Sequence, residues 1–99
     1  MDARIAAFRD GPVPEGVTAP VEALWHVARA AWDTAHGLVQ DDPSREAAWV
    51  HAHLPRVEGD LSNAAYWYGM AGQPVARDAI DAEWRRLVSV LIARPAESP

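Results

Sequence analysis

Residues 49–67 read WVHAHLPRVEGDLSNAAYW, and this stretch decides how the chain is expected to fold. Two His, two acidic residues, an Arg and an Asn stand between Trp residues in what is otherwise the pattern of a core helix. Burying such polar side chains costs free energy unless each finds a hydrogen-bonding partner. The stretch therefore predicts a central helix that carries either a polar network or a binding site.

A single long helix is expected over residues 43–71, because apolar residues recur there at steps of three and four. Its expected inward stripe is Val50, Leu54, Val57, Leu61, Ala64, Ala65 and Tyr68. Pro55 has no backbone N–H and clashes with the carbonyl of His51, so a kink or a short break is expected around residues 53–56. The Gly-Gln-Pro sequence that follows Ala71 is typical of a helix end.

Two more long helices and one short helix are expected around this element. The long ones cover residues 20–40 and 74–93, and the short one covers residues 2–9. Residues 10–19 are rich in Pro and Gly and predict a loop, and residues 94–99 are expected to form a flexible tail. The stripes of the two long helices are Val21, Leu24, Ala28, Ala31, Ala35, Leu38 and Val39, and Ile80, Trp84, Leu87, Val88 and Leu91.

The predicted architecture is one all-α domain over residues 1–99. No run alternates with a period of two, so no strand is expected, and short connections between long helices favour antiparallel neighbours. The result is a small up-down bundle of three long helices plus a short N-terminal helix. A content of 49% apolar and 23% charged residues is typical of a globular domain. The absence of Cys excludes disulfides, thiolate zinc sites and a Cys nucleophile.

The charge of the chain bears on its partners and its location. A net charge of -5 argues against a nucleic-acid partner and against an anionic membrane surface, since both require a positive footprint. The N-terminal residues lack the apolar core of a signal peptide, and no apolar run approaches the roughly 18 residues of a membrane span. We therefore expect a soluble cytoplasmic protein with no nucleic-acid or membrane partner.

A ladder of polar residues borders the stripe of the central helix. His53, Arg56, Asp60, Asn63 and Trp67 follow one another at three- and four-residue steps, while Glu58 lies on the opposite flank with His51. Arg56 and Asp60 are spaced for an ion pair. If the pair is buried, loss of Asp60 should cost about 3 kcal/mol or more, since Arg56 would be left without a partner.

A second polar edge lies on the helix expected over residues 20–40. Asp33, His36 and Gln40 stand at steps of three and four, and the Asp33 carboxylate is placed to orient the His36 imidazole. If this edge faces the central helix, His36 meets His53, Asp60 or Glu58, and a site forms between the first and second long helices. The candidate catalytic residues are then His36, His53, Asp60 and Glu58, and the candidate ligand-binding residues are Arg56, Asn63, Trp67, Asp33 and Gln40.

The spacing of these residues does not favour a metal or a cofactor. His53 and Asp60 are seven residues apart, about 10.5 Å along a helix, which is too far for both to bind one ion. Ligands would have to come from two helices, and a His36, His53 and carboxylate set for zinc or iron is only weakly indicated. No metal and no cofactor is therefore predicted. Among the aromatic residues, Trp25, Trp32 and Trp84 fit the core, whereas Trp67 ends the polar ladder, where an indole suits a small ligand.

Residues 25–74 contain the motifs WDxAH at 32–36 with Gln40, HAxL at 51–54, RxEGDxxNAxYWY at 56–68 and AGxP at 71–74. In these motifs the sequence resembles a family of small all-helical proteins of bacteria and plants that has no assigned activity. The resemblance implies a helical fold and supports the choice of site residues. The chain departs from the family at Pro55, where His is usual, and at Met70, where Arg is usual.

Two functions from different classes are consistent with these patterns. In the first, the protein is a non-catalytic binding or assembly module with a buried His, Asp, Glu, Arg and Asn network, and an exposed apolar face binds a partner or a second copy. In the alternative, it is a small-molecule or metal-binding domain with hydrolase or lyase chemistry. A cleft beside His36, His53 and Asp60 favours the alternative, and an enclosed, fully paired network favours the module.

Overall fold

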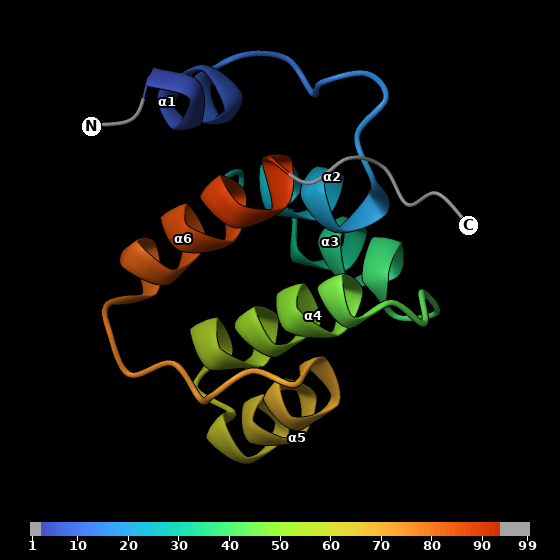
Figure 1. The fold of residues 1–99 in the computed structure, drawn as a ribbon, viewed down its shortest axis with the longest axis vertical. Coiled ribbons are helices and arrows are strands. Elements are labelled where there is room, and N and C mark those ends of the chain that lie inside the picture. Colours follow the sequence, from blue (N-terminus) through green and yellow to red (C-terminus); the bar gives the residue numbers. More distant parts are fainter. Residues whose placement is uncertain (1–2, 94–99) are drawn as a thin grey trace.

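The computed structural model describes residues 3–93, which form six α-helices and no strand (Figure 1). The helices are α1 (Ala3–Asp10), α2 (Ala19–Val27), α3 (Trp32–Val39), α4 (Arg45–Glu58), α5 (Leu61–Ala71) and α6 (Ile80–Ile92). The all-α class is confirmed, but the expected number of four helices is wrong, because two of the expected long helices are each divided. The tail expected at 94–99 lies outside the described residues.

The first division separates α2 from α3. Ala30 has φ 56°, a left-handed conformation that ends the helix expected over residues 20–40. The Arg29 guanidinium stabilises this turn, because it donates to the carbonyl oxygens of Arg9 at 2.8 Å and Gly11 at 3.0 Å. The break is thus held by contacts with a distant segment of the chain.

The second division separates α4 from α5 and lies four residues beyond Pro55. Gly59 ends α4 with φ 84°, which glycine adopts without steric cost, and the Asp60 side chain then caps α5 by accepting a hydrogen bond from the Asn63 N–H. Pro55 itself lies inside α4. Because α4 is continuous over residues 53–56, the short break expected there is wrong, and the break lies at Gly59 instead.

Helix α4 is the centre of the molecule. It packs against α2, α3, α5 and α6, and Figure 1 shows it between α6 and α5. Every residue from Ala47 to Pro55 is buried. Trp84 of α6 donates from its indole N–H to the Leu24 carbonyl of α2 at 2.9 Å, and α1 lies on α6 with its Phe8 side chain buried.

Most of the expected inward residues are buried, and a few are not. Leu61 and Ile80 are among the exposed large hydrophobic residues, and Ala28 and Ala65 are also exposed. Leu61 and Ile80 are the first residues of α5 and α6. Ala28 follows the end of α2, and Ala65 lies in α5, beyond the end of α4. The periodicity of apolar residues does not predict these helix boundaries. Among residues 3–93, none of the helices has both the length and the apolar character needed to cross a membrane.

Candidate functional site

A fully buried carboxylate lies where α4, α5 and α6 meet. Glu83 of α6 is 0% exposed, and its Oε1 lies 2.8 Å from Nδ1 of His53 and 2.9 Å from Nη1 of Arg56, both on α4. The Tyr68 hydroxyl of α5 donates to the other oxygen, Oε2. Hydrogen bonds from two neighbouring helices thus converge on a single side chain.

These contacts fix the protonation of the cluster. Burial alone would raise the pKa of Glu83, but the hydrogen bonds from His53, Tyr68 and Arg56 outweigh it and hold the pKa below its ordinary value of 4.5. Burial, followed by the hydrogen bond to Glu83, raises the pKa of Tyr68. At neutral pH the cluster therefore holds a carboxylate, a protonated phenol and the Arg56 guanidinium.

Arg56 also contacts the segment before α6. It donates to the Asp78 carbonyl, and its Nη1 lies 3.8 Å from the Asp78 carboxylate, which also binds Arg86. The hydrogen bond from Arg86 lowers the pKa of Asp78. The ion pair expected between Arg56 and Asp60 is therefore replaced by ion pairs with Glu83 and Asp78.

His51 joins the ring systems of α3 and α5. Its imidazole stacks on the Trp67 indole with centroids 3.8 Å apart, and the His36 ring meets it edge-on at 4.8 Å. Burial, together with the charge of His36, lowers the pKa of His51 to about 4, so its ring is neutral at neutral pH. Nδ1 of His51 and Nε2 of His53 are buried without a hydrogen-bond partner among the described residues.

Three of the residues proposed from sequence line one pocket. Asp33 and His36 of α3 lie there with Glu58 of α4, and Trp32 and Leu54 complete the lining of a space of about 220 Å³. No hydrogen bond joins Asp33 to His36 within the described structure, so the expected orienting contact is absent there. Two carboxylates beside an indole and an imidazole offer the surroundings that a small organic cation prefers.

The remaining residues proposed from sequence lie apart from this pocket. Asp60 and Asn63 are exposed at the start of α5, and Gln40 is exposed at the end of α3. His53 is 1% exposed and faces Glu83. The polar ladder is thus divided between a buried cluster and the surface.

Sequence reasoning missed the residue at the centre of the buried cluster. The polar ladder predicted from the sequence does not include Glu83, and the predicted stripe places Tyr68 in the apolar core alone. The signal for Glu83 was its spacing, because it stands four residues before Leu87 and eight before Leu91, on the buried stripe of α6. An acid on such a stripe requires donors, which Tyr68 and Arg56 supply.

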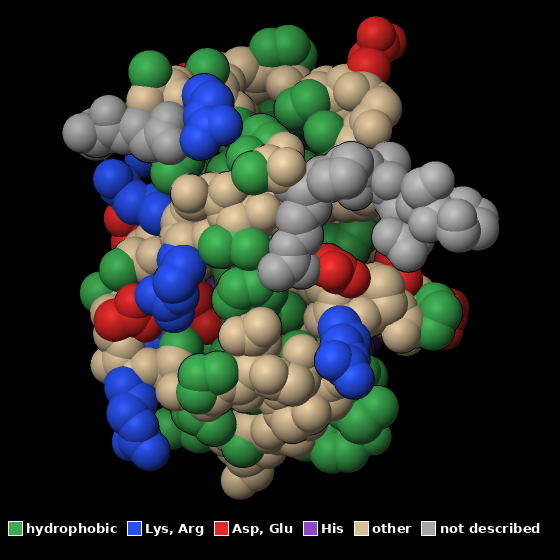
Figure 2. Space-filling model, in the orientation of Figure 1, with side chains coloured by type: hydrophobic (Ala, Val, Ile, Leu, Met, Phe, Trp, Pro, Cys, Tyr) green, Lys and Arg blue, Asp and Glu red, His purple; other side chains and the backbone are tan. Residues whose placement is uncertain are grey.

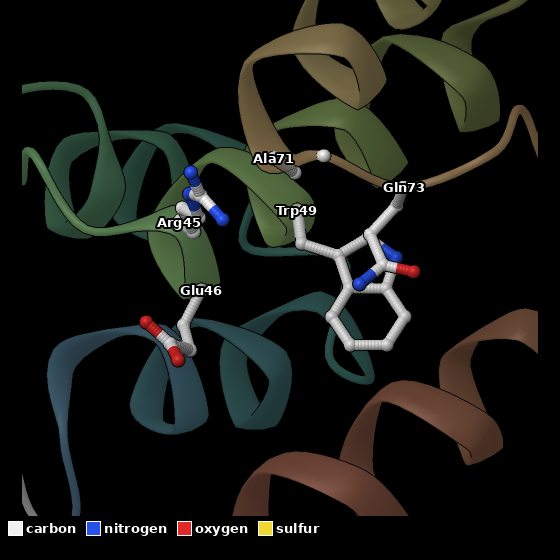
Figure 3. A pocket seen from close by; sticks show the side chains of 6 residues that line it. Arg45, Glu46, Trp49, Ala71 and Gln73 are labelled. Carbon is white, nitrogen blue, oxygen red and sulfur yellow. The ribbon is translucent and has the colours of Figure 1, made fainter.

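A second pocket of about 280 Å³ lies where the start of α4 meets the end of α5 (Figure 3). Trp49 and Gln73 lie on one side of it, and Arg45 and Glu46 on the other. None of these residues was proposed from sequence. Their mixture of charges favours no single ligand class.

Within residues 3–93, no three His, Asp or Glu side chains gather closely enough to hold a metal ion. Comparison of the chain with protein-family models, curated proteins and solved structures gave no match.

Proposed function

We propose that this protein is a non-catalytic assembly module, a helical scaffold that presents α5 to another protein chain. The observation that carries this proposal is the composition of α5. Residues Leu61–Ala71 include no charged side chain, in a chain where 23% of residues are charged. An exposed helix without charge is unusual on a solvated surface and is typical of a protein interface.

The exposed side of α5 is also apolar. Leu61, Tyr66 and Met70 are 67%, 59% and 55% exposed. In Figure 2 the lower end of the molecule, over α5, carries hydrophobic and other uncharged surface without acidic side chains, and an Arg side chain lies at its left edge. Large apolar side chains gathered on one helix lose unfavourable contact with water when a partner covers them.

The buried cluster supports the same proposal. Glu83 has no contact with solvent, and its donors come from α4 and α5, which leaves no room for a substrate at the carboxylate. Its role is then to fix α5, through Tyr68, against α4 and α6. A fixed helix presents its outer side chains in one arrangement, which lowers the entropic cost of binding.

The proposal extends to the setting of the module. We propose a cytoplasmic protein without a nucleic-acid partner, on the basis of the net charge of -5 and the absence of Cys. Membership in the family of small helical proteins that residues 25–74 resemble is part of the same proposal. Fractionation of cells that make the protein would test the location.

Photo-cross-linking in cells tests the binding role of α5. A photoreactive benzoylphenylalanine in place of Tyr66 should give an adduct of defined mass, and the same residue in place of Ala7, exposed on α1, should not. The adduct should be lost when Ala65→Glu is added, because the new charge lies within the face. Absence of an adduct at Tyr66, or equal adducts at both positions, would overturn the proposal.

A second candidate function rests on the pocket between α3 and α4. Asp33, Glu58 and Trp32 line it together, and we propose that it binds a small organic cation. Titration with tetramethylammonium chloride should shift the NMR signal of the Trp32 indole, whereas sodium chloride should not. The shift should vanish in the double variant Asp33→Asn, Glu58→Gln, and a shift that survives there would contradict this candidate.

A further inference from the structure

We propose that the chain that covers α5 is a second copy of this protein, with the two α5 helices antiparallel across a two-fold axis. This inference rests on the proposed function and names its partner. In a two-fold pair the same surface serves both copies, so it must be complementary to itself in shape and in charge. Both conditions are met by residues at this face.

The shape of the face suits close helix packing. Ala65 and Gly69 are exposed and lie one turn apart, between Leu61 on one side and Tyr66 and Met70 on the other. A side chain built at Gly69 would meet no atom within 4 Å, so the backbone there is open to an approaching helix. Ridges of large side chains on one copy fit the shallow row of small residues on the other.

The charges at the ends of α5 favour the antiparallel arrangement. Asp60 is exposed at the N-terminal end, and Arg45 lies at the C-terminal end, where its Nη1 is 3.9 Å from the position of a Cβ on Gly72. Neither residue takes part in an ion pair with another residue of 3–93. Antiparallel pairing over about 16 Å of helix brings Asp60 of each copy toward Arg45 of the other, whereas parallel pairing brings like charges together.

The absence of charge on α5 also matters for a second copy in particular. Each chain carries a net charge of -5, so two copies repel one another over most approaches. The uncharged face is where that repulsion is weakest. The exposed side chains of α5 offer on the order of 500 Å² per copy, so a pair would bury about 1,000 Å², which is the lower end of specific interfaces and implies a weak, reversible dimer.

Sedimentation of the purified full chain tests the pairing. The weight-average mass should rise with concentration from 10.8 kDa toward twice that value. Ala65→Glu should weaken the association at least tenfold, because two new carboxylates face each other near the axis. The matched control Ala7→Glu adds the same charge on α1 and should leave the association unchanged. A wild-type mass that stays at that of one chain up to millimolar concentration would overturn the inference.

Disulfide trapping tests the direction of the helices, and the natural absence of Cys makes single probes unambiguous. In the antiparallel pair position 62 of one copy lies opposite position 69 of the other, because both are exposed in the middle of the face. A mixture of Ser62→Cys and Gly69→Cys chains should therefore form a mixed disulfide in air. Each variant alone should remain uncrosslinked, and self-crosslinking of Ser62→Cys in preference to the mixture would overturn the antiparallel arrangement.

The two proposals fail in distinguishable ways. One outcome is that the purified chain stays monomeric while Tyr66 forms an adduct with a different protein in cells. That result would overturn pairing with a second copy, and the assembly role of α5 would stand. If Tyr66 gives no adduct in cells and sedimentation shows no association, both are wrong. An adduct in cells whose mass is that of two copies supports both.

Discussion

Glu83 is the shared hydrogen-bonding partner of His53, Arg56 and Tyr68. Glu83→Gln keeps the side-chain volume but removes the charge that balances Arg56, which is 11% exposed. Loss of one partner of a buried ion pair costs about 3–5 kcal/mol. Because Arg56 keeps its contact with Asp78, we expect a loss of about 3 kcal/mol in the free energy of unfolding, measured by urea denaturation.

Asp60→Ala is the comparison for that measurement. Asp60 is exposed and caps α5 through the Asn63 N–H, so its loss should cost only about 1 kcal/mol. The larger loss of stability that the sequence predicts for removal of a buried Asp60 is expected instead for removal of the Glu83 charge. Equal losses for the two variants would contradict the buried cluster as described.

His51 makes stability depend on pH. Its pKa is about 4 in the folded chain and 6.5 ordinarily, so between these values the unfolded chain binds the extra proton. Stability from this group is complete above about pH 6.5 and falls as the pH drops toward 4, by about 3 kcal/mol in total.

The measurement is the free energy of unfolding at several pH values for the wild type and for His51→Phe, which can still stack on Trp67. The difference between the two proteins should change over that window in the stated direction. A constant difference from pH 7 to pH 4 would show that His51 is not held neutral.

Individual site residues were partly predictable from the sequence. His53 and Arg56 were recognised as polar groups that need partners, and Asp33, His36 and Glu58 do line one pocket. Their actual partners were not predictable, because Glu83 is 30 residues from His53 and 27 from Arg56. A hydrogen bond across that separation depends on how α6 packs, which local spacing does not specify.

At the scale of the element, Gly59 determines where α4 ends. Gly59 has φ 84°, so Gly59→Ala places a Cβ in the left-handed region and should cost about 1 kcal/mol. Gly37→Ala is the matched control, because Gly37 lies inside α3 with open space around it. That variant should gain about 0.5–1 kcal/mol through lower entropy of the unfolded chain.

Thermal unfolding of both variants checks this prediction. The melting temperature should fall for Gly59→Ala and rise for Gly37→Ala. Changes of the same sign would mean that the helix break does not depend on the left-handed residue.

The two helix breaks differ in how far the sequence reveals them. Gly59 followed by Asp60 is a helix stop followed by a helix start, so this break has a local signal in the sequence. The break at Ala30 has no such signal, because residues 28–31 contain neither Gly nor Pro. Arg29 supplies the cause through its bonds to Arg9 and Gly11, and these are tertiary contacts.

At the scale of the whole molecule, α1 is the least integrated helix. It packs against α6, and its Phe8 ring lies 6.1 Å from that of Trp84. Phe8→Ala should weaken the packing of α1 on α6 by about 3 kcal/mol. Helix α1 should then detach while the rest of the protein stays folded. Amide hydrogen exchange at residues 3–10 should then rise by about 100-fold, while exchange at Ala47–Pro55 stays slow.

Phe8→Leu retains most of the buried surface and should give a smaller rise. If exchange in α4 increases as much as in α1, then α1 is part of the cooperative core. The sequence predicted a helix at this end of the chain and the loop after it, and α1 followed by residues 11–18 agrees with that prediction. It could not indicate that α6, the last helix described, is the element on which α1 packs.

The position of Glu83 and Trp84 in α6 has a consequence for synthesis on the ribosome. A nascent chain that has emerged only as far as Gly72 already holds His53, Arg56 and Tyr68, but not the carboxylate that they contact, nor the indole that binds the Leu24 carbonyl. We therefore expect the emerging helices to stay loosely associated, and the native packing to form only once translation has passed α6.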